Sequence, residues 1–81
     1  MGAFGGALTD KAIDVVNLLI NANPHSAEEY RQRGIMHVRA GKMTAAKDDL
    51  MRYLELAQSA PDRDQVKEQI QSIQHWLASL N

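Results

Sequence analysis

The sequence predicts an all-α fold of antiparallel helical hairpins, and three observations support this prediction. Apolar residues recur at spacings of three and four along four segments, which is typical of helices that bury one face. No segment alternates strictly between apolar and polar residues, so no strand is predicted. Both prolines and Gly41 fall between the four segments, where residues that interrupt a helix are expected.

The first helix is predicted over residues 9–22. Thr9 or Asp10 can cap its N-terminus, because both side chains accept hydrogen bonds from the free amides of a first turn. Asn23-Pro24 ends the helix, since proline lacks an amide donor and disfavours the helical conformation in the residue before it.

The second helix is predicted over residues 27–40. Ser26 and Glu29 have the spacing of a capping box, in which two side chains satisfy two free amides reciprocally. Gly41 is expected to take the left-handed conformation that closes a helix.

The third and fourth helices are predicted over residues 43–58 and 63–80, on either side of Pro61. Asp62 is the predicted N-cap of the fourth helix. Each helix carries one apolar stripe, which predicts that one face of each is buried. The stripes consist of Met43, Ala46, Leu50, Tyr53, Leu54 and Ala57 in the third helix and Val66, Ile70, Ile73, Leu77 and Leu80 in the fourth.

Length and composition indicate one small domain. The chain has 81 residues and a formal net charge of −1, as is typical of a single domain. Residues 1–7 are rich in glycine and are predicted to form a flexible lead-in to a helical domain over residues 8–81. Without cysteine, neither a disulfide nor a thiolate metal site can form. No apolar run approaches the roughly 20 residues of a membrane span, and no signal peptide is recognisable, so a soluble, cytoplasmic protein is expected.

The stretch from Tyr30 to Leu50 resembles the tetratricopeptide repeat, in which a large residue, glycine and alanine recur at fixed positions. The resemblance implies two antiparallel helices that approach closely, because Gly34 and Ala46 have little or no side chain. It also implies a protein that binds another protein. The packing residues that it implies are Ala12, Tyr30, Gly34, His37, Gly41, Ala46 and Leu50.

The register of the 34-residue repeat divides the chain. With Gly34 at the eighth position, residues 27–60 form one full repeat. Ala12 and Pro24 then match the small residue and the final proline of an earlier repeat, so the first helix resembles its second half. Residues 62–80 match the polar capping helix that such arrays need at their end. The implied fold is a fragment of an α–α superhelix.

A narrower pattern is similar to the C-terminal repeat segment of bacterial SirB-type transglutaminase-like proteins. The pattern consists of Arg31-x-Arg33-Gly34, Gly41, Asp49-Leu50-x-x-Tyr53-Leu54-x-Leu56-Ala57 and Ala60-Pro61-Asp62. Arg33, His37 and Gln58 depart from the general repeat, which usually has leucine, tyrosine and proline there. Because the catalytic part of those enzymes lies upstream of the repeats, this resemblance implies an alternative function as a detached regulatory segment without catalytic residues.

In repeats of this type the first helix lines a concave groove. Carried over by register, Arg31 and Arg39 could pair with acidic groups of an extended or helical peptide, while Ile35 and Val38 could bind an apolar anchor. The lysine and asparagine pattern that clamps a carboxylate in this superfamily is missing. Alternatively, these residues only pack locally or face solvent. The implied groove positions are Glu28, Arg31, Gln32, Ile35, Val38 and Arg39.

The first helix predicts self-association. It is apolar on nearly every side, and such a helix is normally buried all round. The preceding half-repeat that would cover one side is absent from this sequence, and an open apolar face of this size would drive association. A two-fold homodimer is the simplest solution, and docking on a different chain is the alternative. The predicted self-association face consists of Ile13, Val16, Leu19 and Ile20.

Catalysis, a cofactor and a metal site are not predicted. Without cysteine there is no thiol nucleophile, and no serine lies in a nucleophile elbow. His25, His37 and His75 lack the spacing of metal ligands, and His37 is expected to pack inside the repeat. Asp48 and Asp49 are neighbours on a helix and do not face each other, so a solvated face is expected for this pair.

Nucleic-acid binding is disfavoured as well. Between Tyr30 and Tyr53 the chain carries six basic and two acidic residues, and a basic helix after a turn is found in helix-turn-helix proteins. The whole chain is slightly acidic, however, and its basic residues are spread around the helices rather than along one stripe. The predicted function is therefore a non-catalytic protein–protein interaction module.

Overall fold

A computed structural model describes the backbone of residues 2–80 and the side chains of residues 10–80. This part of the chain forms four α-helices and no strand, which confirms the predicted all-α fold. The helices are α1 (Gly2–Ala22), α2 (Ala27–Arg39), α3 (Met43–Leu56) and α4 (Arg63–Ser79). None of these four helices is long and apolar enough to cross a lipid bilayer.

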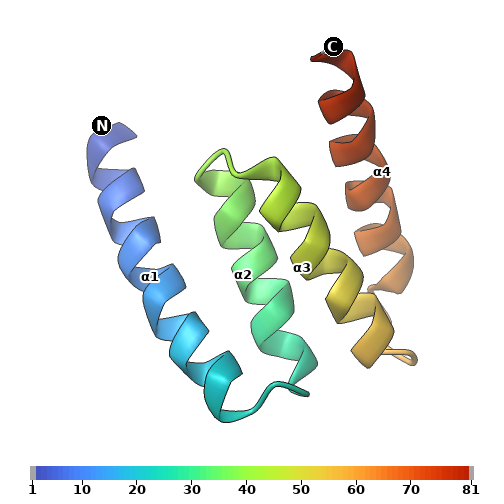
Figure 1. Ribbon diagram of the computed structural model, residues 1–81. Coiled ribbons are helices and arrows are strands. Elements are labelled where there is room, and N and C mark those ends of the chain that lie inside the picture. Colours follow the sequence, from blue (N-terminus) through green and yellow to red (C-terminus); the bar gives the residue numbers. More distant parts are fainter. Residues whose placement is uncertain (1, 81) are drawn as a thin grey trace.

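The helices lie side by side in chain order, and each runs antiparallel to the one before it (Figure 1). Over residues 2–80, α1 contacts α2, α2 contacts α3 and α3 contacts α4, and no other pair of helices comes into contact. Such an array has two end helices, α1 and α4, each covered by a neighbour on one side only. This arrangement agrees with the predicted stack of repeat helices.

The main core lies between α2, α3 and α4. Ala46 and Leu50 are 0% and 1% exposed. Gly34 of α2 packs against both, since a Cβ atom at this glycine would lie 2.9 Å from Leu50 Cδ2 and 3.4 Å from the Ala46 carbonyl oxygen. The small residues therefore set the close approach of α2 and α3. The same buried cluster also contains Tyr53, Val66, Ile70 and Ile73.

The turn from α2 to α3 closes through Gly41, which has a φ of 76° and so adopts the predicted left-handed conformation. α2 ends at Arg39, one residue earlier than predicted. The Gly41 amide donates to the Val38 carbonyl over 3.0 Å, and the Lys42 amide donates to the His37 carbonyl over 2.8 Å. Both bonds satisfy carbonyls that the end of a helix would otherwise leave free.

Ser26 and Asp62 occupy the N-cap positions of α2 and α4 as predicted, but neither side chain makes the predicted hydrogen bond to a backbone amide. The Ser26 hydroxyl donates to the Glu29 carboxylate and makes no bond to a backbone amide. The charged carboxylate is a strong acceptor for the hydroxyl proton, while the hydroxyl oxygen, which a cap would use as its acceptor, receives no backbone amide. The Asp62 carboxylate accepts a hydrogen bond from the buried Tyr53 hydroxyl instead of capping α4.

α1 begins at Gly2, well before the predicted start at Thr9. Neither Thr9 nor Asp10 is therefore a cap, and the helix includes residues 2–7, which the sequence assigned to a lead-in. Glycine lowers helix propensity by about 1 kcal/mol relative to alanine, and for this reason the glycine-rich start predicted no helix. The flexibility expected of this segment stays a prediction.

The connection between α3 and α4 is held by Arg63. α3 ends at Leu56, two residues before the predicted end, and α4 ends at Ser79, one residue before it. Arg63 Nη1 donates to the carbonyls of Leu54 and Ala57 over 2.6 and 2.9 Å. The guanidinium thereby satisfies free carbonyls at the end of α3 and ties the start of α4 to them.

One carboxylate is buried where the sequence predicted a solvated face. Asp48 is exposed, but Asp49 is only 6% exposed. Arg33 donates to both carboxylate oxygens of Asp49 over 2.9 and 2.7 Å. It also donates to Asn17 Oδ1 of α1 over 2.8 Å. A buried charge needs such a partner, because desolvation would otherwise be too costly. The ion pair consequently links α1, α2 and α3.

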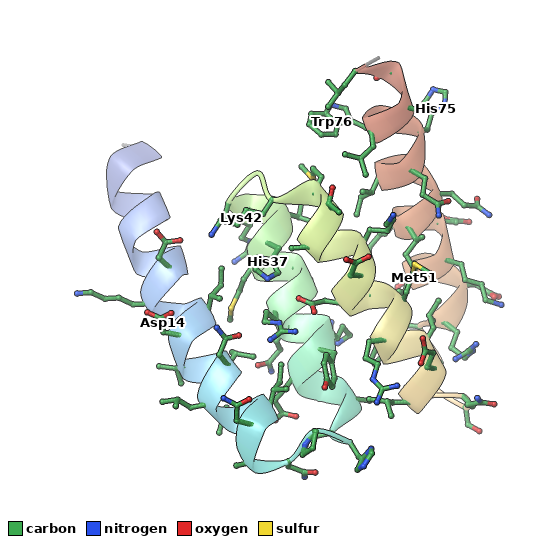
Figure 2. All side chains as sticks on the ribbon, viewed as in Figure 1. Asp14, His37, Lys42, Met51, His75 and Trp76 are labelled. Carbon is green, nitrogen blue, oxygen red and sulfur yellow. The ribbon has the colours of Figure 1, made fainter. Side chains whose placement is uncertain are left out.

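His37 lies on α2 near the turn that holds Lys42 (Figure 2). Its Nε2 atom is 3.3 Å from Asp49 Oδ2. Burial lowers the pKa of His37 below its ordinary value of 6.5, and Arg33 and Lys42 lower it further, while Asp49 raises it. The buried Nδ1 atom has no hydrogen-bond partner. Arg33 and His37, which both depart from the usual repeat residues, thus contact the same buried aspartate.

Candidate functional site

An open groove lies between α2 and α4, and we call it the α2–α4 groove. The two helices do not contact each other, so α3 forms the floor between them. The groove has a volume of about 590 Å³, which lies in the range of roughly 300–1,000 Å³ that is usual for ligand pockets. Its lining consists of Ile35, Val38 and Arg39 of α2, Leu50 of α3, and Gln65, Glu68, Gln69, Ser72 and Ile73 of α4.

The groove is mainly apolar on α2 and α3 and mainly polar on α4, where Ile73 is the apolar exception. Ile35 of α2 and the buried Leu50 of α3 contribute aliphatic side chains. Gln65, Gln69 and Ser72 contribute uncharged groups that can both donate and accept hydrogen bonds. The groove can therefore bury an apolar side chain of a ligand and bond the peptide groups beside it.

Two opposite charges flank the groove, Arg39 on α2 and Glu68 on α4. Both side chains are exposed, and neither takes part in the ion pairs formed by residues 10–80. Charges of this kind at the rim of a binding surface mainly orient a ligand and speed its association. A ligand with an acidic group beside α2 and a basic group beside α4 would match them.

The six groove positions implied by the sequence divide into two sets. Ile35, Val38 and Arg39 line the groove, whereas Glu28, Arg31 and Gln32 do not. Arg31 forms an ion pair with Glu28 over 2.5 Å, and this hydrogen bond lowers the pKa of the Glu28 carboxyl. Of the two arginines expected to bind acidic groups, only Arg39 therefore faces the groove.

The α4 wall was missed because the fourth helix was treated as a polar cap. A signal for it was present in the repeat length. Adding 34 residues to the six implied groove positions gives Asp62, Gln65, Val66, Gln69, Ser72 and Ile73, of which all but Asp62 and the buried Val66 line the groove. α4 therefore occupies the place of the first helix of a following repeat, and it offers its groove positions accordingly.

The polar wall of α4 continues into an aromatic residue beyond the groove. Trp76 follows Ser72 by one helical turn and is 47% exposed. Figure 2 shows its indole on the side of α4 that is turned toward the other helices, with His75 on the opposite side. Tryptophan is one of the residue types that most often provide binding energy in protein interfaces.

The outer helix α1 buries a different face from the one expected to be open. Three residues of the predicted self-association face, Ile13, Val16 and Ile20, are 4–7% exposed and lie on the buried face of α1. The packing of α1 on α2 buries these three side chains within a single chain, so no second copy is needed to cover them. Leu19 alone is exposed, and the other large apolar residues that α1 exposes among residues 10–22 are Val15 and Leu18.

Four residues predicted to pack the repeat lie outside the main core, namely Ala12, Tyr30, His37 and the exposed Gly41. Tyr30 packs partly buried against this core, and its hydroxyl donates to the Pro24 carbonyl over 3.0 Å. The guanidinium carbons of Arg33 and Arg52 lie 5.6 and 5.9 Å from the centre of its ring, which is the range of cation–π contacts. Ala12 is half-buried on α1.

The three histidines lie on separate parts of the array. His25 is exposed in the turn between α1 and α2, His75 is exposed on α4, and His37 is partly buried on α2. Among the side chains that the structure describes, no three or more histidine, aspartate or glutamate residues gather as metal ligands would.

A family model for the tetratricopeptide repeat matches residues 4–71. The match includes the α2 and α3 residues of the groove and all of its α4 residues except Ser72 and Ile73. No curated protein and no solved structure matches the chain.

Proposed function

The chain belongs to the tetratricopeptide repeat family, and from this premise we propose that it is a non-catalytic interaction module that binds a peptide segment of another protein in the α2–α4 groove. Repeat arrays of this kind use the concave surface formed by successive repeats to bind partners. The observation that carries the proposal is the open groove of about 590 Å³, in which aliphatic side chains lie beside uncharged hydrogen-bonding groups.

The spacing of the polar wall favours an extended segment. Gln65 and Gln69 are four residues apart on α4, which is about 6 Å along a helix. Alternate residues of an extended chain are separated by a similar distance, about 6.6 Å. The two carboxamides can therefore bond successive outward-facing peptide groups, while an aliphatic side chain of the segment packs on Ile35 and Leu50.

A library of random nonapeptides, selected against the immobilised protein, tests this proposal. Selected peptides should carry an aliphatic residue and an acidic residue at a constant spacing. Arg39→Ala should weaken their binding about two- to fivefold, mainly through slower association, because Arg39 is an exposed charge at the rim of the groove. Arg31→Ala is the matched control, because Arg31 lies outside the groove and pairs with Glu28. If no peptide is selected, or if both variants bind alike, the groove is not the binding site.

Self-association through α1 is a second function that a separate observation supports. Val15, Leu18 and Leu19 are 57%, 69% and 48% exposed on one end helix of the array. Contiguous apolar residues of this kind on a soluble protein commonly mark an interaction surface. Sedimentation velocity at increasing protein concentration measures the association directly, and a single monomer species throughout would contradict it.

The narrower resemblance to SirB-type transglutaminase-like proteins supports a different proposal, in which the chain is a regulatory segment of such an enzyme. This proposal predicts a domain with catalytic cysteine, histidine and aspartate encoded upstream in the same reading frame. Sequencing of the surrounding gene decides the matter, since an upstream stop codon would rule the domain out.

A further inference from the structure

The face of α1 that points away from α2 has the pattern of a helix-pairing seam. Lys11, Val15, Leu18 and Ala22 are all exposed and follow one another at spacings of four, three and four. At about 100° per residue, these four positions lie opposite the buried stripe that contains Ile13. Alternating spacings of three and four place residues along one line of contact between two helices. We call these four residues the outer seam.

The two edges of the outer seam differ in polarity. Asp14 and Asn21 are exposed on one edge (Asp14 is labelled in Figure 2), and Leu19 lies on the other together with the half-buried Ala12. One edge therefore offers polar groups and the other offers apolar ones. A partner helix that matches this surface needs a polar residue opposite Asp14 and a small or apolar residue opposite Leu19.

A second copy of α1 meets these requirements when it runs antiparallel. If a two-fold axis passes between residues 16 and 17, Val15 faces Leu18 of the second copy and Lys11 faces Ala22 of the second copy. The polar edges then coincide, with Asp14 beside Asn21 of the second copy. The apolar edges coincide in the same way, with Leu19 beside Ala12 of the second copy.

Charge opposes the parallel arrangement. A parallel two-fold pair would place Lys11 directly against Lys11 of the second copy, and like charges at such positions destabilise a helix pair. In the antiparallel pair the two lysines are separated by the length of 11 residues, about 16 Å along the axis. At that distance the interaction is largely screened at physiological ionic strength.

We propose that two copies of the chain associate through their α1 helices as an antiparallel two-fold pair centred between residues 16 and 17. This inference rests on the self-association proposed above and adds the partner surface and its orientation. The seam covers just over three helical turns of one helix. A pair of single helices buries less surface than the roughly 800 Å² per partner of a stable standard interface, so a weak and reversible dimer is expected.

Cysteine cross-linking tests the orientation, because the natural chain contains no cysteine. Lys11→Cys and Ala22→Cys are made separately, and one of them carries an affinity tag so that the mixed dimer is distinguished by size. A disulfide needs Cβ atoms about 4 Å apart. The antiparallel pair predicts that a mixture of the two variants forms the mixed disulfide on mild oxidation, and that neither variant alone forms a cross-linked dimer.

Other outcomes each overturn a defined part of the proposal. A cross-linked dimer of Lys11→Cys alone shows a parallel pair, and the antiparallel geometry is then wrong. Dimers seen by sedimentation without any cross-link place the interface elsewhere on the chain. A monomer at every concentration contradicts self-association itself, while the peptide-binding result with Arg39→Ala stands independently of all three outcomes.

A charged substitution gives a second readout. Leu18→Glu should raise the dimer Kd at least tenfold, because two carboxylates would replace apolar contacts at the centre of the pair. Leu18 is exposed in the single chain, so circular dichroism should show an unchanged fold. Leu80→Glu, directly after α4, is the matched control, since Leu80 is similarly exposed and α4 does not contact α1. Equal effects of both variants would contradict the assigned surface.

Discussion

Replacing Gly34 by alanine tests the close approach of α2 and α3. The added Cβ atom would lie 2.9 Å from Leu50 Cδ2 and 3.0 Å from Leu50 Cγ. Leu50 is 1% exposed, so its side chain is packed against neighbours on nearly every side. The substitution therefore forces either the leucine out of its rotamer or the two helices apart.

Two opposing contributions set the change in the free energy of unfolding that Gly34→Ala causes. Alanine has a better helix propensity than glycine by about 1 kcal/mol, which favours the variant. Overpacking of a well-packed core costs about 1–3 kcal/mol, which opposes it. We expect a net loss of about 1 kcal/mol in the free energy of unfolding, or a fall in Tm of about 4–8 °C for a domain of this size.

A double-mutant cycle with Leu50→Ala isolates the steric contribution. Removal of the leucine leaves only the propensity effect at residue 34, so the coupling free energy should be about 1–3 kcal/mol. Urea unfolding followed by circular dichroism measures it, with an osmolyte present for all variants because Leu50→Ala alone costs about 2–5 kcal/mol.

Gly41→Ala is the matched control for this cycle. Its cost comes from the left-handed φ of 76°, and no atom lies within 4 Å of the position of its Cβ. Its effect should therefore add to that of Leu50→Ala without coupling. A Gly34→Ala variant that is more stable than the natural protein, or that shows no coupling to Leu50→Ala, would refute the steric argument.

Three further predictions concern the polar contacts. Asp49→Asn should lower the free energy of unfolding by about 2–3 kcal/mol. This is less than the loss for a fully buried ion pair, because Arg33 still reaches solvent. The exposed control Asp48→Asn should change the free energy of unfolding by less than about 0.5 kcal/mol. Burial lowers the pKa of His37 in the folded chain, so its contribution to the Tm should be fully present above about pH 6.5 and should decrease as the pH falls below that value. His37→Gln should remove this decrease. Tyr53→Phe should cost about 1 kcal/mol in urea unfolding, because its hydroxyl bonds the carboxylate that precedes α4; an unchanged value would show that this bond contributes nothing.

The local signals in the sequence predicted the helices well and their caps poorly. Gly41 closes α2 as expected, because only a residue that tolerates a positive φ fits that turn. Ser26 and Asp62 occupy capping positions but bond other side chains. Whether a side chain caps a helix depends on competing donors and acceptors nearby, and Tyr53 reaches Asp62 from another helix.

The residues of the candidate site were also predicted only in part. Ile35, Val38 and Arg39 were implied by the repeat register and line the groove. Arg31 shares that register but turns to Glu28, which lies one turn away on the same helix. A register places a residue on a helix, but the competing partners around its side chain decide where that side chain points.

The sequence by itself determined the number of helices, the turns between them and most of the residues of the buried stripes, because helical periodicity and glycine or proline turns are properties of neighbouring residues. Leu80, at the end of the predicted stripe of the fourth helix, is 63% exposed. The tertiary structure decided which polar residue is buried and which apolar residue is not. Asp49 is buried because Arg33 and His37 reach it from α2. Leu18 is exposed because α1 stands at the end of the array and has a neighbour on one side only.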